Sequence, residues 1–287
     1  MNIITKPQLL QQHLNHLRSK KKTLGFVPTM GALHEGHLSL VRRARRENKI
    51  VVVSIFVNPT QFGPKEDFKK YPRSRSRDLK MLKKAKADIV FCPTAKSMYP
   101  GGYKTPVDPR VRKAVKKMIR VLCGKSRPTH VQVVIAVVSE LFNLVGACRA
   151  YFGANDYQQA VIIKKMAAVL NPDIRVKTCP IVREKDGLAL SSRNRYLSSP
   201  ERRRAVKLSE TPRWLKREIR SRRKGSLGAI KSQAKRRLKD SVSRVDYLDP
   251  VDPETLVSLK KRQPKMLAAG ACFLGKTRLI DNVIIKL

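Results

Sequence analysis

A strand-like segment that runs directly into a glycine-bearing turn with two histidines constrains the fold most. The apolar run at 24–27 is followed by the sequence PTMGALHEGH at 28–37, and a helical pattern begins at residue 38. Glycine lets the backbone approach a ligand closely, and a strand, such a turn and a helix start form the phosphate sites of α/β sheets. His34 and His37 can donate to a triphosphate and to the charge that develops when it is cleaved. The alternative is a turn with two surface histidines.

The first half of the chain alternates apolar, β-branched runs with helical patterns. The expected strands are 23–27, 50–57, 89–92, 150–152 and 174–178, and the expected helices are 38–47, 77–86, 134–145 and 157–170. This alternation is typical of an α/β fold, here a Rossmann-like, doubly wound parallel sheet with helices on both faces. Ligand sites lie beyond the carboxyl ends of such strands. We therefore expect the turns that hold His37, Gln61 and Asp156 at one edge of the sheet.

The pattern changes near residue 180. A basic, helical region covers 200–240, and short strand candidates follow it at 245–248, 266–273 and 283–286. This arrangement indicates a smaller α+β domain that closes over the first as a lid. The expected domains are 1–179 and 180–287.

Five further motifs follow the histidine turn in order. They are VVSIFVNPTQF at 52–62, YPRS at 71–74, FGANDYQQ at 152–159, DGLALSSRN at 186–194 and GKTRLIDN at 275–282. The ordered set resembles the pantoate–β-alanine ligase (pantothenate synthetase) family of the HIGH-motif nucleotidyltransferase superfamily. The resemblance runs from about residue 1 to residue 287, and it implies a Rossmann-like fold with a nucleotide- and pantoate-binding first domain.

The resemblance also implies a reaction in two steps. The carboxylate of (R)-pantoate attacks the α-phosphate of ATP, giving pantoyl adenylate and pyrophosphate, and the amine of β-alanine then displaces AMP to form pantothenate. Neither step needs a protein nucleophile, so catalysis is expected from positioning and charge stabilisation. ATP and Mg²⁺ are the implied cofactors.

Residue by residue, the resemblance assigns His37 as the proton donor, His34 as a phosphate ligand beside it, and Arg193 as a forked contact to phosphate oxygens. In this chain an ordinary surface arginine is a strong alternative for Arg193. The implied ATP contacts are Met30, Gly31, Ala32, Leu33, His34, Glu35, Gly36, His37, Gly153, Ala154, Asn155, Asp156, Val182, Leu190, Ser191, Ser192 and Arg193.

The resemblance places the other substrates on amide side chains. Gln61 is expected to hold pantoate and β-alanine, Gln159 to make a second pantoate contact, and His130 to border the pantoate pocket. An amide donates and accepts at once, which suits a hydroxy acid. Asp78 is a candidate ligand of Mg²⁺, because this ion takes only one or two carboxylates and keeps its water; a solvated aspartate on a helix face is the alternative.

Two departures from the family pattern fall among these residues. The family's G-x-K-D segment has Asn155 in place of lysine, and a neutral amide cannot replace an ammonium at a phosphate. In the segment RPTHVQVV at 127–134, Thr129 and Val133 stand where the family has glycine. If those glycines had positive φ, the β-branched replacements would be strained.

The charge of the chain is the feature that the resemblance does not explain. Lysine and arginine number 63 against 21 acidic residues, a formal net charge of +42. Three interpretations remain open: solvated, overcharged helix faces, a surface that binds a polyanion such as nucleic acid or an anionic membrane, and disorder around 213–240.

The five cysteines show no metal-ligand spacing, which indicates reduced thiols in a cytosolic protein. No apolar run approaches the length of a membrane span, so we expect a cytoplasmic protein without membrane contact. The resemblance implies a homodimer, which the net charge opposes at low salt.

Three hypotheses for the function follow from these observations. The first is an ATP-dependent pantoate–β-alanine ligase. The second is a catalytically impaired homologue that still binds ATP, with Asn155 as the cause. The third is a basic polyanion-binding protein on the same scaffold, to which nonspecific nucleic-acid binding would belong.

Overall fold

A computed structural model describes residues 1–62, 68, 71–103, 107–221 and 225–287. The chain forms two compact units. Unit 1 comprises 1–116, 129–153 and 159–180, and unit 2 comprises 117–128, 154–158 and 181–287. The expected domain boundary at 179/180 lies one residue before the start of the last segment of unit 2 at Ile181, but two earlier segments also belong to this unit. The division into a binding domain and a lid stays a prediction.

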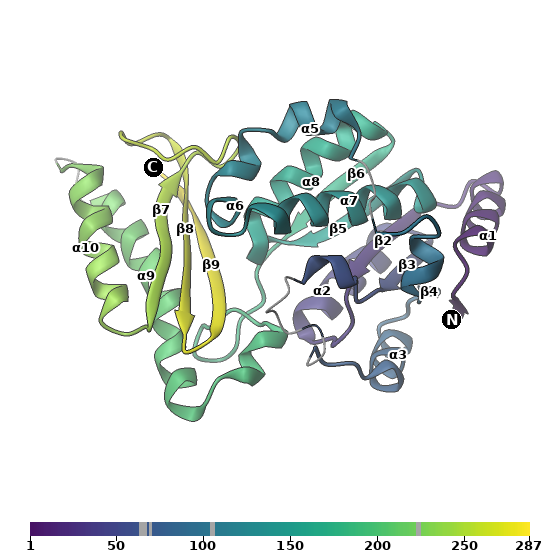
Figure 1. The fold of residues 1–287 in the computed structure, drawn as a ribbon, viewed down its shortest axis with the longest axis horizontal. Coiled ribbons are helices and arrows are strands. Elements are labelled where there is room, and N and C mark those ends of the chain that lie inside the picture. The colour runs from purple at the N-terminus through teal and green to yellow at the C-terminus, as the bar shows by residue number, and fades with distance from the viewer. Residues whose placement is uncertain (63–67, 69–70, 104–106, 222–224) are drawn as a thin grey trace. The chain divides into compact units, whose positions relative to one another are not determined.

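Unit 1 is built on a six-stranded sheet in which all pairings between the described strands are parallel (Figure 1). Its order is β1-β4-β3-β2-β5-β6. The strands are β1 (Asn2–Ile4), β2 (Leu24–Thr29), β3 (Ile50–Ile55), β4 (Ile89–Phe91), β5 (Cys148–Gly153) and β6 (Ile174–Cys179). The predicted α/β class is confirmed, and five of these strands match expected ones. The edge strand β1 was not expected from the sequence.

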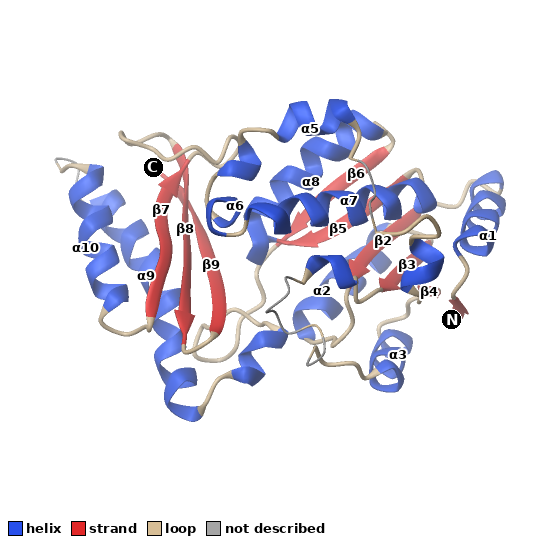
Figure 2. Ribbon diagram, viewed as in Figure 1, coloured by secondary structure: helices blue, strands red, loops and turns tan. Residues whose placement is uncertain are grey.

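Helices cover both faces of this sheet (Figure 2). They are α1 (Pro7–Ser19), α2 (Glu35–Glu47), α3 (Arg75–Lys84), α4 (Ala95–Met98), α5 (Pro109–Val115), α7 (Pro128–Val145) and α8 (Tyr157–Leu170), with a short 3₁₀ turn η1 (Pro59–Gln61). On one face Val27, Val51 and Val53 pack against Val41 of α2 and Leu82 of α3, all fully buried. Because β side chains alternate between faces, such runs must be apolar on both sides of a covered sheet.

By length and composition alone, α7 is apolar enough to cross a membrane. Eight of its residues are buried, among them Ile135, Leu141 and Phe142. A core helix passes the same test of length and composition, so one such helix is weak evidence for a membrane span.

Unit 2 contains an antiparallel sheet of order β7-β8-β9 and two long helices that pack on it. Its main elements are η2 (Met118–Arg120), α6 (Cys123–Ser126), η3 (Ala154–Asp156), η4 (Ser192–Tyr196), α9 (Ser199–Ser221), α10 (Leu227–Lys239), β7 (Arg244–Val251), β8 (Lys265–Leu274) and β9 (Thr277–Lys286). Its core joins Leu215 and Ile219 of α9 to Ile230 of α10 and Met266 of β8. Residues 213–221 and 227–239 are helical, so the hypothesis of disorder around 213–240 is wrong for the described part of that stretch.

None of the five cysteines, all of which the structure describes, is in a disulfide. Cys148, Cys179 and Cys272 are buried, whereas Cys92 and Cys123 are partly exposed. Burial raises the pKa of Cys148 to about 12, which keeps that thiol protonated. The three buried cysteines therefore act as small apolar side chains.

Candidate active site

The strand order of unit 1 creates a switch point at β2, where the chain changes from one side of the sheet to the other. The chain leaves β2 for β3 on one side and later returns to pair β5 on the other side of β2. Parallel sheets bind ligands at such a switch point, beyond the carboxyl ends of the strands. The turns after β2, β3 and β5 carry the predicted residues of unit 1, among them His37, Gln61 and Gly153.

The turn after β2 is held in an uncommon backbone conformation. Gly31 has a φ of +77° and Ala32 a φ of +50°, and the second value is unfavourable for a residue with a Cβ. The Thr29 hydroxyl donates to the carbonyl of Ser54 at 2.7 Å and accepts the N–H of Gly31 at 3.1 Å. The start of the turn is thereby tied to the end of the neighbouring strand β3.

Asp78, on the first turn of α3, fixes the next part of the same turn. Its side-chain oxygens accept the backbone N–H groups of Ala32 and Leu33, each at 2.9 Å, and the residue is only 2% exposed. A buried carboxylate with two such donors forms charge-assisted hydrogen bonds. The alternative of a solvated helix-face aspartate is therefore wrong.

The surroundings of Asp78 do not fit a dedicated magnesium site. Both of its oxygens already bind backbone N–H groups. Among the residues that the structure describes, no group of three or more His, Cys, Asp or Glu side chains could hold a metal. The geometry fits an anchor of the turn better than a ligand of Mg²⁺.

The two histidines cap the helix that follows the turn. Nδ1 of His34 accepts the N–H of Gly36 at 3.2 Å, and Nδ1 of His37 accepts the N–H of His34 at 3.4 Å. This is the geometry of a capping box, with His34 as N-cap and His37 at N3 of α2. An accepting Nδ1 assigns the proton of a neutral ring to Nε2. The rings lie 4.1 Å apart between centroids.

Burial is the main cause of an unusual protonation state at His37. It lowers the pKa of the imidazole to about 3, and the charge of His34 lowers it further. At neutral pH His37 is therefore an uncharged ring whose remaining N–H can donate a hydrogen bond. A histidine with an ordinary pKa would be partly charged near pH 6.5.

The turn after β3 meets the first turn of α7. Nδ1 of His130 lies 3.2 Å from the backbone oxygen of Gln61 in η1, so two of the predicted pantoate residues come together. Thr129 and Val133 lie inside α7, and neither is among the non-glycine residues of positive φ. The strain considered for these two positions is absent.

The turn after β5 divides between the units. Gly153 ends β5 in unit 1, and Gln159 lies in the first turn of α8 in the same unit. Ala154, Asn155 and Asp156 form η3 in unit 2.

Asn282 of β9 holds the η3 turn. Its side-chain amide donates to the carbonyls of Ala154 and Asn155, at 2.7 Å and 2.9 Å. Within the described part of the chain, the side-chain oxygen of Asn155 is buried and has no hydrogen-bond partner. A buried polar atom without a partner costs free energy, so this position is suited to a polar ligand. Asn282 lies in the motif at 275–282, from which the sequence predicted no role for this residue.

The remaining predicted nucleotide residues lie on one loop of unit 2. The carbonyl of Val182 accepts the N–H of Leu190 at 3.0 Å, which closes the loop, and the Ser191 hydroxyl accepts the N–H of Arg193 at 3.2 Å. Ser192 and Arg193 begin η4. Among the residues that the structure describes, none forms an ion pair or hydrogen bond with the guanidinium of Arg193, in agreement with a group available to an anion.

Arg183 anchors this loop and was missed by the sequence analysis. Its guanidinium donates to both oxygens of Asp281, at 2.7 Å and 2.8 Å, and Asp281 is 2% exposed. Burial raises the pKa of Asp281, although the guanidinium opposes this shift. Because Asn282 is the next residue, β9 positions both η3 and the 182–193 loop.

The parallel sheet, with a histidine-capped turn at its switch point, defines a Rossmann-like α/β protein of the HIGH-motif kind. Comparison with known proteins narrows this class. A family model described as pantoate-beta-alanine ligase matches residues 2–284. The chain belongs to the pantoate–β-alanine ligase family.

Relatives and solved structures agree with this assignment. The pantothenate synthetase of Thermosipho africanus is 47% identical over 285 residues, covering 99% of this chain and 100% of the relative. A crystal structure of pantothenate synthetase from Thermus thermophilus has a TM-score of 0.89 and 40% identity over 99% of each chain. The pantoate-beta-alanine ligase of Francisella tularensis, complexed with beta-gamma ATP and β-alanine, has a TM-score of 0.78 and 32% identity, over 99% of this chain and 97% of the other.

Proposed function

We propose that the chain condenses (R)-pantoate with β-alanine in an ATP-dependent reaction that passes through pantoyl adenylate and releases AMP and pyrophosphate. The observation that carries this proposal is the histidine-capped turn. Two imidazoles with accepting Nδ1 atoms stand at the N-terminus of α2, beside a backbone fixed by Asp78. The solved relative complexed with beta-gamma ATP and β-alanine supports the same substrates.

The turn would bind the phosphates of ATP by hydrogen bonds rather than by formal charge. The N-terminus of a helix favours an anion, and the rings of His34 and His37, whose Nδ1 atoms accept hydrogen bonds, would donate from Nε2. Because their Nδ1 atoms are held by backbone N–H groups, the donors are fixed before the substrate binds. Fixed donors stabilise the charge that develops on the phosphate as pyrophosphate leaves.

Pantoate would lie beyond β3 and β5. Gln61 would hold its hydroxyl or carboxylate, with β-alanine beside it, and Gln159 would make a second contact. His130 would act as a positioning residue, because its imidazole touches the backbone of Gln61 at 3.2 Å. Such positioning is the main catalytic demand on a reaction between two bound substrates.

Arg193 would supply a cation to the phosphates from the 182–193 loop. In this chain Arg193 would supply a larger share of the positive charge at the phosphates, since Asn155 replaces the family lysine. The remaining contacts of the ATP set, from Met30 to His37, at Gly153 to Asp156 and at Val182 to Arg193, are proposed as backbone and side-chain contacts. Mg²⁺ would arrive bound to ATP and water, since the carboxylate of Asp78 is already engaged.

A substitution at Asn155 distinguishes a fully active ligase from an impaired one. Removing a charged contact to a developing anion commonly costs about 10²–10³ in rate. If Asn155 limits turnover, Asn155→Lys should raise kcat by about tenfold or more, with the release of AMP as the measurement. Asn171→Lys, on a turn outside the predicted site, is the control for an added charge. An unchanged kcat in Asn155→Lys would mean that another cation, such as Arg193, already supplies the charge.

The test of the proposed function is the release of AMP from ATP, pantoate and β-alanine with Mg²⁺, with each substrate omitted in turn. We expect release only when all three are present, and pyrophosphate without β-alanine if pantoyl adenylate forms first. No release from a folded protein that binds ATP would favour the impaired homologue and contradict the proposal. The homodimer and the cytoplasmic location remain predictions, the first of them open to light scattering at several salt concentrations.

A further inference from the structure

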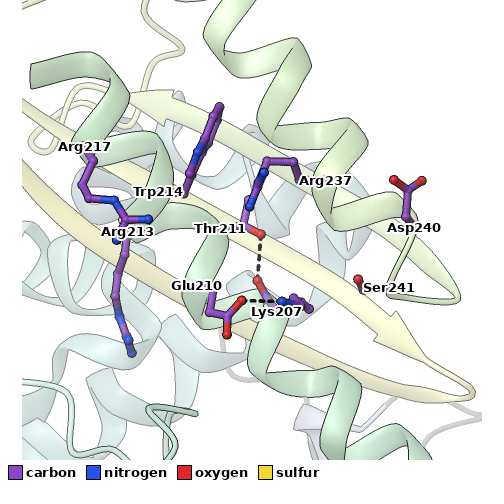
Figure 3. Close-up of a pocket in the computed structure, with 9 residues that line it drawn as sticks. All are labelled: Lys207, Glu210, Thr211, Arg213, Trp214, Arg217, Arg237, Asp240 and Ser241. Carbon is purple, nitrogen blue, oxygen red and sulfur yellow. Dashed lines mark hydrogen bonds and ion pairs between the residues drawn. The ribbon is translucent and has the colours of Figure 1, made fainter. Parts of the chain in front are cut away.

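A cavity of about 550 Å³ lies in unit 2, where α9 faces the end of α10 (Figure 3). Cavities of this size accommodate small organic ligands. None of the residues that line it belongs to the predicted ATP or pantoate set. The cavity is therefore a candidate for a second binding site on the same chain.

The lining carries both signs of charge, with an excess of cations. Lys207, Arg213, Arg217 and Arg237 face two carboxylates, those of Glu210 and Asp240, which gives a formal excess of two positive charges. The ammonium of Lys207 pairs with Glu210 at 2.7 Å, and Arg213 donates to the carbonyl of Gly187 at 2.8 Å. These contacts leave the cations of Arg217 and Arg237 as the main attraction for an anion.

An aromatic ring stands beside these cations. Trp214 is the single tryptophan of the chain, and its indole is half-buried against the core of unit 2. The guanidinium of Arg237 lies over the indole, 5.0 Å from the ring centroid. A guanidinium held on an aromatic face is well placed to bind phosphate oxygens while the same pair contacts a planar ring.

We propose that this cavity binds a nucleoside monophosphate. A phosphate dianion would balance the formal excess of two positive charges and would lie against Arg217 and Arg237. A base would lie against Trp214, and the hydroxyls of a ribose could donate to Glu210 or Asp240, as ribose hydroxyls donate to carboxylates in dinucleotide sites. A bare polyanion fits less well, because the same two carboxylates would repel it.

The inference does not depend on the proposed ligase reaction. All nine lining residues belong to unit 2, and the histidine turn belongs to unit 1. A chain without ligase activity could therefore still bind a nucleotide in this cavity. An active ligase could equally lack the second site.

The test is binding of AMP at about 0.15 M salt, where long-range attraction between exposed charges is largely screened. Equilibrium dialysis with labelled AMP measures the affinity, and the fluorescence of Trp214 reports on the cavity. Arg217→Ala/Arg237→Ala removes the two cations. Arg220→Ala/Arg236→Ala is the matched control, since it removes one exposed arginine outside the lining from each of the same two helices.

We expect saturable binding of AMP that quenches Trp214, with an affinity about tenfold or more weaker in the lining variant and unchanged in the control. The same quenching should persist in His37→Ala, which would separate this site from the histidine turn. Thermal melting of both double variants shows whether they fold. If the lining variant does not fold, Arg217→Lys, which keeps the charge but not the fork, should weaken AMP binding less than Arg217→Ala.

Three outcomes would overturn the proposal. One is the absence of saturable quenching of Trp214 by AMP in both the folded wild type and folded His37→Ala. Another is an equal loss of affinity in the two double variants, which would assign the binding to the overall charge. The third is equal affinity for AMP, ribose 5-phosphate and inorganic phosphate, since the cavity would then recognise an anion without a nucleoside.

Discussion

The turn at 29–37 in unit 1 and the two helices α9 and α10 in unit 2 use charge in opposite ways. The turn depends on a single buried carboxylate, that of Asp78, and on the imidazole of His37, which burial keeps neutral at neutral pH. Helix α9 carries eight lysines and arginines against three glutamates, and α10 carries five against none. Most of these cations are exposed.

Charge has a large effect on stability in this molecule where it is buried, and a small one where it is solvated. Removing a buried carboxylate or one of its backbone donors leaves a buried polar group without a partner, which lowers the free energy of unfolding strongly. Exposed ion pairs contribute only about 0–1 kcal/mol to that free energy. The large net charge therefore says little about the chemistry of the candidate site. Few, fixed and mostly uncharged groups distinguish the turn, and many solvated charges distinguish the helices.

The largest effect is expected from His37→Ala. Loss of one fixed donor to a developing charge should lower kcat by about 10²–10³, measured as the rate of AMP release. His16→Ala on α1 is the control, because that ring is exposed and outside the site. A loss of less than a few-fold in His37→Ala would break the comparison, since the turn would then not stabilise the reaction.

Asp78→Asn tests the buried carboxylate. The amide keeps one accepting oxygen but directs N–H donors toward a backbone N–H, so we expect a loss of about 1–3 kcal/mol in the free energy of unfolding. The KM for ATP should rise while that for pantoate stays, because the affected turn is the proposed phosphate site. Asp173→Asn, on an exposed turn, is the matched control. Equal rises in both KM values would argue that Asp78 has a general structural role.

The sequence predicted the sheet well and its contacts poorly. Apolar runs such as 50–55 indicate buried strands because both of their faces are covered. The strand at Asn2–Ile4 was missed, since two exposed residues and one partly buried residue at an edge have no such pattern. The general rule for parallel sheets predicts that the turns lie at one edge, whereas the order of the strands was not predicted from the sequence.

The contacts that position the site could not be predicted from local sequence patterns. Asp78 reaches Ala32 across 46 residues of sequence, and Asn282 reaches Ala154 across 128. Neither pairing has a periodic signal, because each depends on where the elements pack. The histidine cap was visible in principle, since His34 and His37 stand three residues apart, as the two members of a capping box do.

A pH titration of stability sharpens the account of His37. Its pKa is about 3 in the folded chain, against 6.5 for an ordinary histidine. Below pH 6.5 the unfolded chain therefore binds a proton that the folded chain does not, and the free energy of unfolding falls by up to about 1.4 kcal/mol per pH unit. Between pH 6.5 and pH 4.5 the wild type should lose roughly 2 kcal/mol more than His37→Gln, as measured by urea unfolding. Equal losses would mean that His37 titrates normally.

The smallest effect is expected from the exposed cations. Arg220→Ala/Arg236→Ala should change kcat and KM by less than about twofold and the free energy of unfolding by less than about 0.5 kcal/mol, because both side chains are exposed and lie outside the candidate site. Self-repulsion predicts a small gain in stability for this variant at low salt, which added salt should cancel. A clear loss of activity would contradict the separation of roles, since the solvated charge would then act on the same reaction as the buried turn.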